Sequence, residues 1–188
     1  MNGCLNTALF SDSYQVTTLQ EEDIPAVFAL CRKNELYYQY CPPMVTMDSI
    51  RSDLHALPTG AEMSQKYDVG YYQNGRLVAI MDLITGWPEE RTVWIGLFMV
   101  DVSCQRKNAG TKIIHDLKMA LKQAGFEMIQ LGWMQGNPQA EHFWKKNGFV
   151  PLDIPRHTSR GDVIIAQYQY EIMNPCLIAM HVMYSKSY

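Results

Sequence analysis

The sequence predicts a single α/β domain, in which helices cover both faces of a mixed central sheet of about six to seven strands. Three observations lead to this fold class. Asn74-Gly75 lies between two strand-like segments and is the strongest short signal for a β-hairpin. The run 92–100 (TVWIGLFMV) is nearly all apolar, as expected of a central strand buried on both faces. Residues 109–124 place apolar side chains at helical spacing, which predicts an amphipathic helix.

The first third of the chain is predicted to hold one strand and two helices. Residues 14–19 alternate weakly between polar and apolar side chains and suit an opening strand. Pro25 lies in the first turn of a helix with an apolar stripe, and a second helix is predicted over 46–57. Between them, the segment 36–43 (LYYQYCPP) contains three tyrosines, a cysteine and two prolines.

The rest of the chain is predicted to complete the sheet. The further strands are expected at 66–73, 76–84, 127–133 and 163–170. Asn137 caps a second long helix, which ends at Gly148, and 151–162 is predicted to be a loop. Because the hairpin strands come first and a helical crossover follows, the sheet contains both antiparallel and parallel pairs.

Composition excludes several classes of protein. The 188 residues carry 16 Lys and Arg against 19 Asp and Glu, a net charge of -3, so neither nucleic acid nor an anionic membrane is expected as the main partner. Five cysteines without a CxxC pair argue against a disulfide framework or a structural zinc site. No signal peptide is apparent at the N-terminus, and the apolar stretch 176–183 is too short to span a bilayer. We therefore expect a soluble cytoplasmic protein with reduced thiols.

The stretch 100–110 carries the clearest functional signal. A buried strand ends at Val100, a short polar loop follows, and a helix begins near Ala109. The start of a helix presents free backbone N–H groups and partial positive charge, and Arg106 and Lys107 add two cations. This arrangement suits a diphosphate, although an ordinary solvated pair of basic residues is the alternative for Arg106 and Lys107.

The hexapeptide 105–110 (QRKNAG) resembles the pyrophosphate loop of the GNAT (GCN5-related N-acetyltransferase) superfamily, Q/R-x-x-G-x-G/A. Gln105 takes the first position and Gly110 the last. Asn108 replaces the middle glycine, and asparagine is the residue that best tolerates a left-handed backbone after glycine. Its side chain stands where a phosphate would approach, so this departure favours weaker CoA binding.

The segment 137–149 resembles the second GNAT signature, N-x-x-A-x-x-x-Y-x-x-x-G-F. Four positions match in type and spacing: Asn137, Ala140, Gly148 and Phe149. In the family the asparagine reaches the pantetheine arm, and the tyrosine near the thioester sulfur can protonate the leaving thiolate. Trp144 takes the place of that tyrosine, and an indole N–H donates a hydrogen bond but is no practical acid.

The resemblance implies a GNAT-type domain that carries out N-acetyl transfer. Two central strands, here 92–100 and 127–133, are expected to splay apart and hold the acyl-pantetheine arm. Acetyl-CoA would be the acyl donor, no metal is required, and a primary amine of a small molecule or protein would attack directly in a ternary complex. The tyrosine-rich segment resembles a subgroup of small bacterial-type GNAT proteins of unassigned substrate. The expected CoA-binding residues are Met99, Val100, Gln105, Arg106, Lys107, Asn108, Ala109, Gly110, Thr111, Asn137 and Trp144.

Three residues are candidates for catalysis. Asp82 lies inside an otherwise apolar strand and ranks first as the general base, with a structural hydrogen-bonding role as an equal alternative. His142 lies on the last helix beside Trp144 and ranks second. Trp144 itself is a candidate through its place in the second signature.

Two other classes of function stay open at this stage. Asn108 and Trp144 favour a non-catalytic acyl-CoA-binding or regulatory module, and an interaction protein that kept only the fold would bind no CoA. The acceptor amine has no readable motif. We place the core of the domain at 13–172, and the apolar tail 173–188 suits either an edge strand or a homodimer contact.

Overall fold

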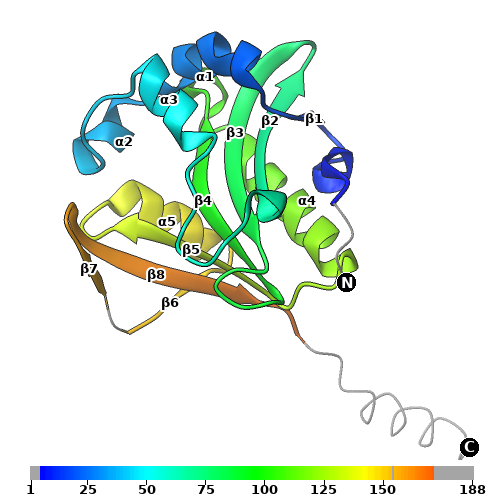
Figure 1. Ribbon diagram of the computed structural model, residues 1–188, viewed down its shortest axis with the longest axis vertical. Coiled ribbons are helices and arrows are strands. Elements are labelled where there is room, and N and C mark those ends of the chain that lie inside the picture. The colour runs from blue at the N-terminus through cyan, green and yellow to red at the C-terminus, as the bar shows by residue number, and fades with distance from the viewer. Residues whose placement is uncertain (1–4, 154, 172–188) are drawn as a thin grey trace, which may run out of the picture.

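A sheet of eight strands runs through the centre of the structure, a computed structural model that describes residues 5–153 and 155–171 (Figure 1). The strand order is β1-β2-β3-β4-β5-β8-β6, and β7 pairs with the outer part of β8. The strands are β1 (Gln15–Thr18), β2 (Lys66–Gln73), β3 (Arg76–Thr85), β4 (Thr92–Val100), β5 (Met128–Met134), β6 (Val150–Pro151), β7 (Arg156–Thr158) and β8 (Gly161–Gln169). Only β4 and β5 pair in parallel among the described strands, so the mixed sheet predicted from the sequence is confirmed.

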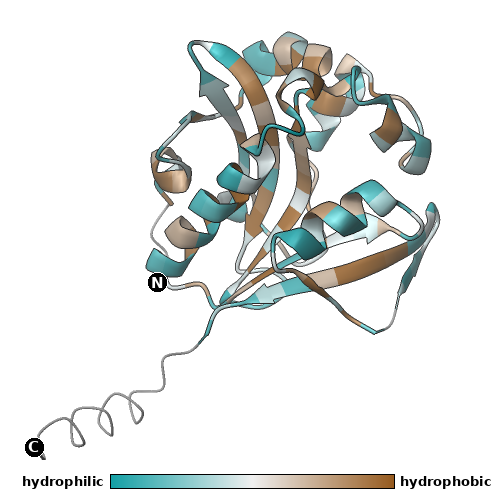
Figure 2. Cartoon of the chain, turned by 180° about the vertical axis from the view of Figure 1, so that it is seen from behind, coloured by the Kyte–Doolittle hydropathy of each residue, from teal (hydrophilic) through white to brown (hydrophobic). Residues whose placement is uncertain are grey.

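Helices cover both faces of this sheet. The helices are α1 (Ile24–Cys31), α2 (Glu35–Tyr40), α3 (Met47–Asp53), α4 (Ala109–Gln123) and α5 (Pro138–Lys146). Short 3-10 turns are η1 (Thr7–Phe10), η2 (Glu21–Asp23), η3 (Met63–Gln65) and η4 (Val102–Cys104). Seen from behind, α4 and α5 lie in front of the sheet, whereas α1 and α3 cover the opposite face (Figure 2).

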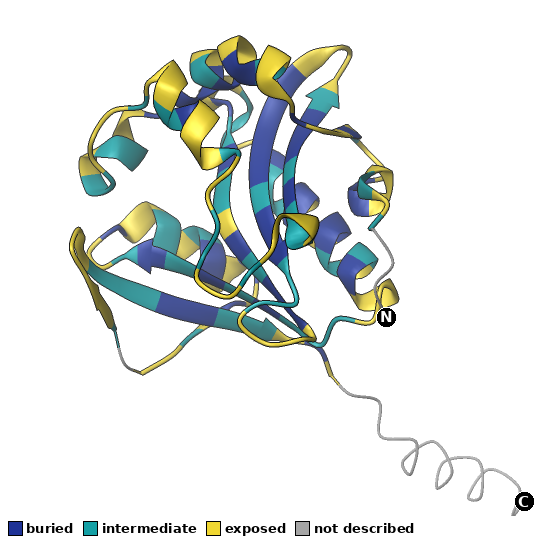
Figure 3. Cartoon of the chain, in the orientation of Figure 1, coloured by how far each residue is buried: buried dark blue, intermediate teal, exposed yellow. Residues whose placement is uncertain are grey.

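Each face has its own apolar core. Ile113, Leu117 and Leu121 of α4 are fully buried against the central strands. On the other face, α1 and α3 pack on the β3 and β4 side chains Ile80 and Met99. The dark blue of buried residues therefore runs along the central strands and the inward sides of the helices (Figure 3). Burial of apolar area at about 25 cal/mol per Å² is the main stabilising contribution of such a layered packing.

The predicted elements are present, with two differences. The expected loop at 151–162 is wrong in part, because β6 ends at Pro151 and residues 156–158 form β7, which pairs with β8. All three β7 residues are exposed, so no alternation in the sequence marks them as a strand. The segment 36–43 contains a short helix, α2, which the pattern of tyrosines and prolines did not indicate.

The expectations about the C-terminal tail, membrane-spanning helices and cysteines can be compared with the structure only where residues are described. The tail predicted as an edge strand or dimer contact (173–188) lies outside the described residues, so both roles stay predictions. Within the ranges described, no helix is both long enough and apolar enough to cross a bilayer. Cys31, Cys41 and Cys104 are free thiols.

The hairpin between β2 and β3 offers a test of the fold. Asn74 and Gly75 both have a left-handed backbone, with φ of 51° and 75°, as the tight turn requires. Asn74→Ala should lower the free energy of unfolding by about 1–2 kcal/mol, because alanine tolerates this conformation poorly. Asn74→Gly is the matched control and should change stability little. Urea denaturation would measure both, and equal stability of the alanine and glycine variants would contradict the turn geometry.

Candidate active site

A gap between β4 and β5 is the first component of the site. The two parallel strands pair only over residues 92–95 of β4 and 128–131 of β5. Beyond this point β4 continues to Val100 and β5 to Met134 without pairing to each other. The second half of β4 is accordingly less buried than predicted, with Gly96 exposed to solvent. The splayed central strands implied by the family resemblance are therefore present.

The alternation of hydrogen bonds decides which backbone groups of β4 face the gap. Asp101 N donates to Val78 O across the β3 edge, at 2.9 Å. In an antiparallel ladder, Met99 is then also bonded to β3, while Phe98 and Val100 present their N–H and C=O groups to the gap. Of the two residues expected to orient a thioester, Val100 thus has its backbone on the gap side and Met99 has it on the β3 side.

Asp101 shapes the loop that follows β4. Its Oδ1 accepts hydrogen bonds from Ser103 N at 2.9 Å and Ser103 Oγ at 2.6 Å, which caps η4. Arg76 and Lys33 pair with the same carboxylate at 3.0 and 3.5 Å. Burial raises the pKa of Asp101, but the Ser103 hydrogen bonds and the two cations outweigh it, so the pKa lies below its ordinary value. Asp101 therefore positions the loop as a buried anion.

Gln105 ties the loop to the end of β4. Its Nε2 donates to Val100 O at 3.0 Å and to Asn34 Oδ1 at 2.7 Å. Asn34 Nδ2 donates in turn to Val100 O at 3.3 Å. No local pattern in the sequence marks Asn34, because its link to the loop spans 71 residues of sequence.

The loop presents a row of unused backbone donors. Within the described residues, none of the N–H groups from position 106 to 111 donates a hydrogen bond to a protein acceptor. Asn108 has φ of 63°, the left-handed conformation expected where the family has glycine, and Arg106 has φ of 59°. Arg106 and Lys107 are exposed beside the N-terminus of α4. Unpaired N–H groups, a helix N-terminus and two cations together suit a diphosphate.

The start of α4 also packs closely on α5. Ala109 is buried and Thr111 is half-buried. A Cβ atom at Gly110 would lie 3.1 Å from the Phe143 ring, so a larger residue would push the two helices apart. This contact keeps the N-terminus of α4 beside the open end of the gap.

α5 contributes a polar cap and an aromatic cluster. Asn137 is buried, and its Oδ1 accepts from Ala140 N at 3.1 Å, which confirms the predicted cap. Its side-chain NH2 group donates no hydrogen bond within the described residues, so it is free for a ligand. Trp144, 8% exposed, packs against Phe98, Phe143 and Phe149, with ring centroids 5.0–6.0 Å from its own. The structure thus places Trp144 in the core beside the splayed part of β4.

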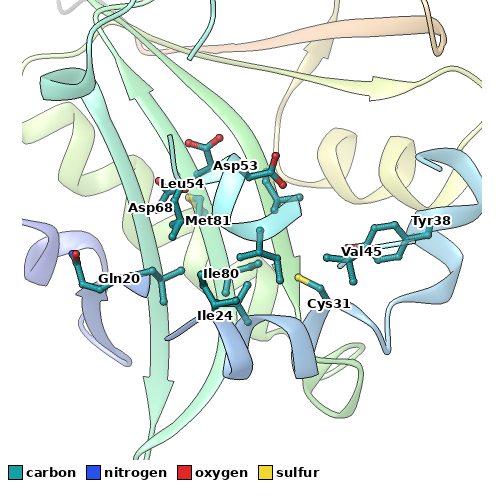
Figure 4. A pocket seen from close by; sticks show the side chains of 15 residues that line it. Gln20, Ile24, Cys31, Tyr38, Val45, Asp53, Leu54, Asp68, Ile80 and Met81 are labelled. Carbon is teal, nitrogen blue, oxygen red and sulfur yellow. The ribbon is translucent and has the colours of Figure 1, made fainter. Parts of the chain in front are cut away.

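A cavity lies on the opposite face of the sheet, between β2–β4 and the helices α1–α3 (Figure 4). Its walls are mainly apolar, and its volume is about 60 Å³, enough for a few waters or a small amine head group. Gln20 lies at one end and Tyr38 at the other, with Asp53 and Asp68 between them (Figure 4). Burial raises the pKa of the Cys31 thiol to about 11, so it is no thiolate nucleophile at neutral pH.

Asp82 joins this cavity to β4. It lines the cavity from β3, opposite Leu97 of β4. The register between the two strands shifts here, so that Gly96 is an extra residue on β4, a β-bulge. A Cβ atom at Gly96 would lie 2.6 Å from Asp82 Oδ2, which means that the carboxylate occupies the space left by the glycine. The bulge comes directly after the last pair between β4 and β5.

Two charged residues that sequence reasoning missed accompany Asp82. Lys66 Nζ pairs with Asp82 Oδ1 at 2.8 Å and with Asp68 Oδ2 at 3.4 Å. Burial raises the pKa of Asp82, although the hydrogen bond and charge of Lys66 lower it. Burial and the charge of Asp82 raise the pKa of Asp68 to about 7. A usable signal was present, since charged residues two apart in a predicted strand lie on one face.

His142, the second candidate for the base, is separate from this group. It is exposed on α5, and it does not line the cavity that contains Asp82. The described residues also contain no group of three or more His, Cys, Asp or Glu arranged to hold a metal ion.

Comparisons with known proteins agree with this architecture. The profile of the Acetyltransferase (GNAT) family matches residues 30–149. A search of curated proteins found no match. Among solved structures, an acetyltransferase from Thermus thermophilus matches with a TM-score of 0.69 at 14% identity, over 84% of this chain and 97% of that one. At this level of identity such a likeness shows the fold alone.

Two further structures have the same fold. The ribosomal-protein-S18-alanine N-acetyltransferase from Escherichia coli has a TM-score of 0.63 at 17% identity, over 86% of this chain and 96% of that one. The PaiA N-acetyltransferase from Thermoplasma acidophilum, solved in complex with coenzyme A, has a TM-score of 0.59 at 16% identity, over 84% of this chain and 99% of that one.

The buried charge of Asp101 gives a pH-dependent prediction. Because its pKa is lower in the folded than in the unfolded protein, its stabilisation is present above the unfolded pKa of about 3.9 and is lost as pH falls through the folded pKa. Asp101→Asn should therefore lower the unfolding free energy by about 1–3 kcal/mol at pH 7. The difference from wild type should shrink towards pH 3.

Urea denaturation of both proteins between pH 7 and pH 3 measures this difference. Glu141→Gln, which breaks the exposed pair with Lys145, is the control and should cost less than about 0.5 kcal/mol. A difference for Asp101→Asn that does not change with pH would show that its charge is not the stabilising feature.

Proposed function

The chain belongs to the GNAT acetyltransferase family, and on that basis we propose that it moves an acetyl group from acetyl-CoA to a primary amine of a small molecule or protein. The amine attacks the thioester directly in a ternary complex. One observation carries the proposal: the Asp82 carboxylate lies over the bulge in β4, immediately after the point where β4 and β5 part. A base thereby borders the gap in which the acyl arm would lie.

The residues present fit a CoA donor. The unpaired N–H groups at 106–111, with Arg106 and Lys107, would hold the diphosphate. The free NH2 group of Asn137 and the gap-facing N–H group of Val100 would pair with the pantetheine arm. When bound, acetyl-CoA supplies an acyl carbon activated by a thiol leaving group. This chain's own residues orient that carbon and receive the proton of the amine.

Asp82 is proposed as the general base. An amine with a pKa of about 10.4 pays about 4.6 kcal/mol to be neutral at pH 7. Holding amine and thioester together can contribute roughly 7–11 kcal/mol, so positioning outweighs the cost of deprotonation. A nearby carboxylate is therefore sufficient as a base. One proton of the ammonium passes to Asp82, and the nitrogen lone pair forms the bond to the acyl carbon.

A general acid is dispensable in this proposal. As the C–N bond forms, the C–S bond breaks and its electron pair leaves on sulfur, while the second amine proton goes to the thiolate or to water. A thiol with a pKa of about 8.5 is a good leaving group close to neutral pH. Trp144 is then part of the aromatic wall beside Phe98 and not a proton donor.

The cavity on the α1–α3 side is proposed as the acceptor site. Its apolar walls and Tyr38 suit the body of a small amine, and its carboxylates suit the ammonium group. Free thiols at Cys31, Cys41 and Cys104 support a reducing, cytoplasmic location. A non-catalytic acyl-CoA-binding module is the second candidate, favoured by the absence of an acidic residue type at Trp144 and by the side chain of Asn108 in the loop.

Binding of acetyl-CoA can be tested by thermal unfolding. At 100 times its dissociation constant the ligand should stabilise the fold by about 2.7 kcal/mol, which corresponds to a Tm increase of roughly 5–11 °C. Asn108→Gly should enlarge the increase at a fixed, subsaturating concentration, because it removes a side chain from the loop. A wild-type Tm unchanged at millimolar acetyl-CoA would refute CoA binding and with it the enzyme.

The role of Asp82 can be separated from that of His142 by CoA release from acetyl-CoA in the presence of amines. Asp82→Asn should lower kcat by about 10²–10⁴-fold, the usual contribution of a general base. His142→Gln should leave kcat unchanged, since His142 lies apart from the cavity. Both variants should keep the Tm increase with acetyl-CoA. A loss of activity in His142→Gln but not in Asp82→Asn would assign the base to α5. If no CoA is released even by the wild-type protein, the non-catalytic binding module is favoured.

A further inference from the structure

Lys66 is the most deeply buried member of a group of three charged side chains, and its two partners, Asp68 and Asp82, line the acceptor cavity. Its side chain is 2% exposed, whereas those of Asp68 and Asp82 are 16% and 26% exposed. Its ammonium group lies between the two carboxylates, 2.8 Å from Asp82 and 3.4 Å from Asp68. A lysine is rarely buried to this degree unless its charge is paired.

The strand register brings the two carboxylates together. Asp68 of β2 lies directly opposite Asp82 of β3, and such residues have Cβ atoms about 4.5–5.5 Å apart. Like charges in this position repel each other. The single positive charge of Lys66 balances only one of the two carboxylates, so the group either keeps one excess negative charge or binds one proton on a carboxylate. Lys66 lies closer to Asp82 than to Asp68, so it stabilises the ionised form of Asp82 more strongly. The carboxylate that binds the proton is therefore Asp68.

Other charged groups near the pair are few and identifiable. Asp53 of α3 lines the same cavity, and its charge, like that of Asp82, raises the pKa of Asp68. Arg160, in the turn between β7 and β8, acts on Asp53 with the opposite sign. Cys31 of α1 and Tyr38 of α2 complete the titratable lining, and burial raises the pKa of both, so they stay neutral near pH 7.

We propose that Lys66 is a positioning residue that holds Asp82 ionised over the β4 bulge, and that Asp68 is the second acceptor to which Asp82 passes the proton taken from the amine. The inference rests on the proposed acetyl transfer and extends it by giving the proton a path. Asp82 accepts one proton from the ammonium, returns to its charged form by giving it to Asp68, and Asp68 releases it to water. No redox step or further reactant is involved.

The path has a defined pH dependence. Asp68 accepts the proton only when ionised, and its pKa is raised to about 7. The rate is therefore full above this pH and falls as pH decreases through it. Asp68→Asn should lower kcat above pH 7, because Asp82 must then give its proton directly to water. It should also remove the inflection near pH 7 from the kcat profile, and the remaining acid limb should lie at lower pH and report Asp82 alone.

The effect of Lys66 is tested with a charge-matched pair of variants. Lys66→Met leaves two buried carboxylates without a cation and is at risk of not folding. Lys66→Met in the Asp68→Asn background removes one charge of each sign and avoids that risk. Compared with Asp68→Asn alone, the double variant should have the acid limb of its kcat profile at a pH about one to three units higher. The reason is that Asp82 loses the nearby positive charge that lowers its pKa. The probes are 2-phenylethylamine, spermidine and an alanine-initiated peptide.

A titration by NMR provides a readout that needs no acetyl transfer. With ¹³C-carboxyl-labelled aspartate, wild type should show one carboxyl that titrates near pH 7, which should be missing in Asp68→Asn. Carboxyl titrations and acid limbs that are the same in all folded variants would overturn the proposal and reduce Lys66 to a structural residue. If no probe amine releases CoA from wild type, the proposed function fails, whereas the NMR titration still decides whether Lys66 and Asp68 control the charge of Asp82.

Discussion

The short parallel pairing between β4 and β5 is the constraint on which the site depends. Pairing stops after Ile95 and Leu131, so backbone groups further along β4 that face β5 have no partner in the sheet. Buried backbone donors and acceptors without partners are costly, and a gap of this kind persists because water or a ligand can satisfy them. The aromatic cluster around Trp144 and Phe98 supports one side of the gap and keeps the strands from closing by packing against the splayed part of β4.

Two irregularities in strand register bring the proposed base to this gap. One bulge, near Tyr71 in the pairing of β2 with β3, sets Asp68 opposite Asp82. The other makes Gly96 an extra residue on β4, and the Asp82 carboxylate occupies the space above it. Bulges re-aim side chains in this way and are frequent beside active sites. The bulge in β4 thus lies where the sheet opens and positions a carboxylate at this opening.

The overall charge of the protein is nearly balanced, but the two parts of the site, the loop at 105–111 and the cavity, carry opposite charge. The net charge is only -3, yet the loop at 105–111 presents free N–H groups and exposed cations. The cavity, in contrast, is lined by Asp53, Asp68 and Asp82, and Lys66 pairs with the last two. An anionic donor and a cationic acceptor would therefore be drawn to different ends of the site. Asp101, which holds the loop in place as a buried anion, belongs structurally to the first region although its charge has the opposite sign.

The sequence by itself determined the order of elements, the hairpin at Asn74-Gly75, the phosphate-type loop with a left-handed Asn108, and the cap at Asn137, because each depends on neighbouring residues or on a local repeat. It also singled out Asp82 as a charge in an apolar strand. Only the tertiary structure decided what surrounds Asp82. A regular two-residue hairpin pairs Asp68 with Met81, and a single inserted residue moves Asp82 opposite Asp68. No local pattern records that insertion, because side-chain packing across several strands determines where a register shifts.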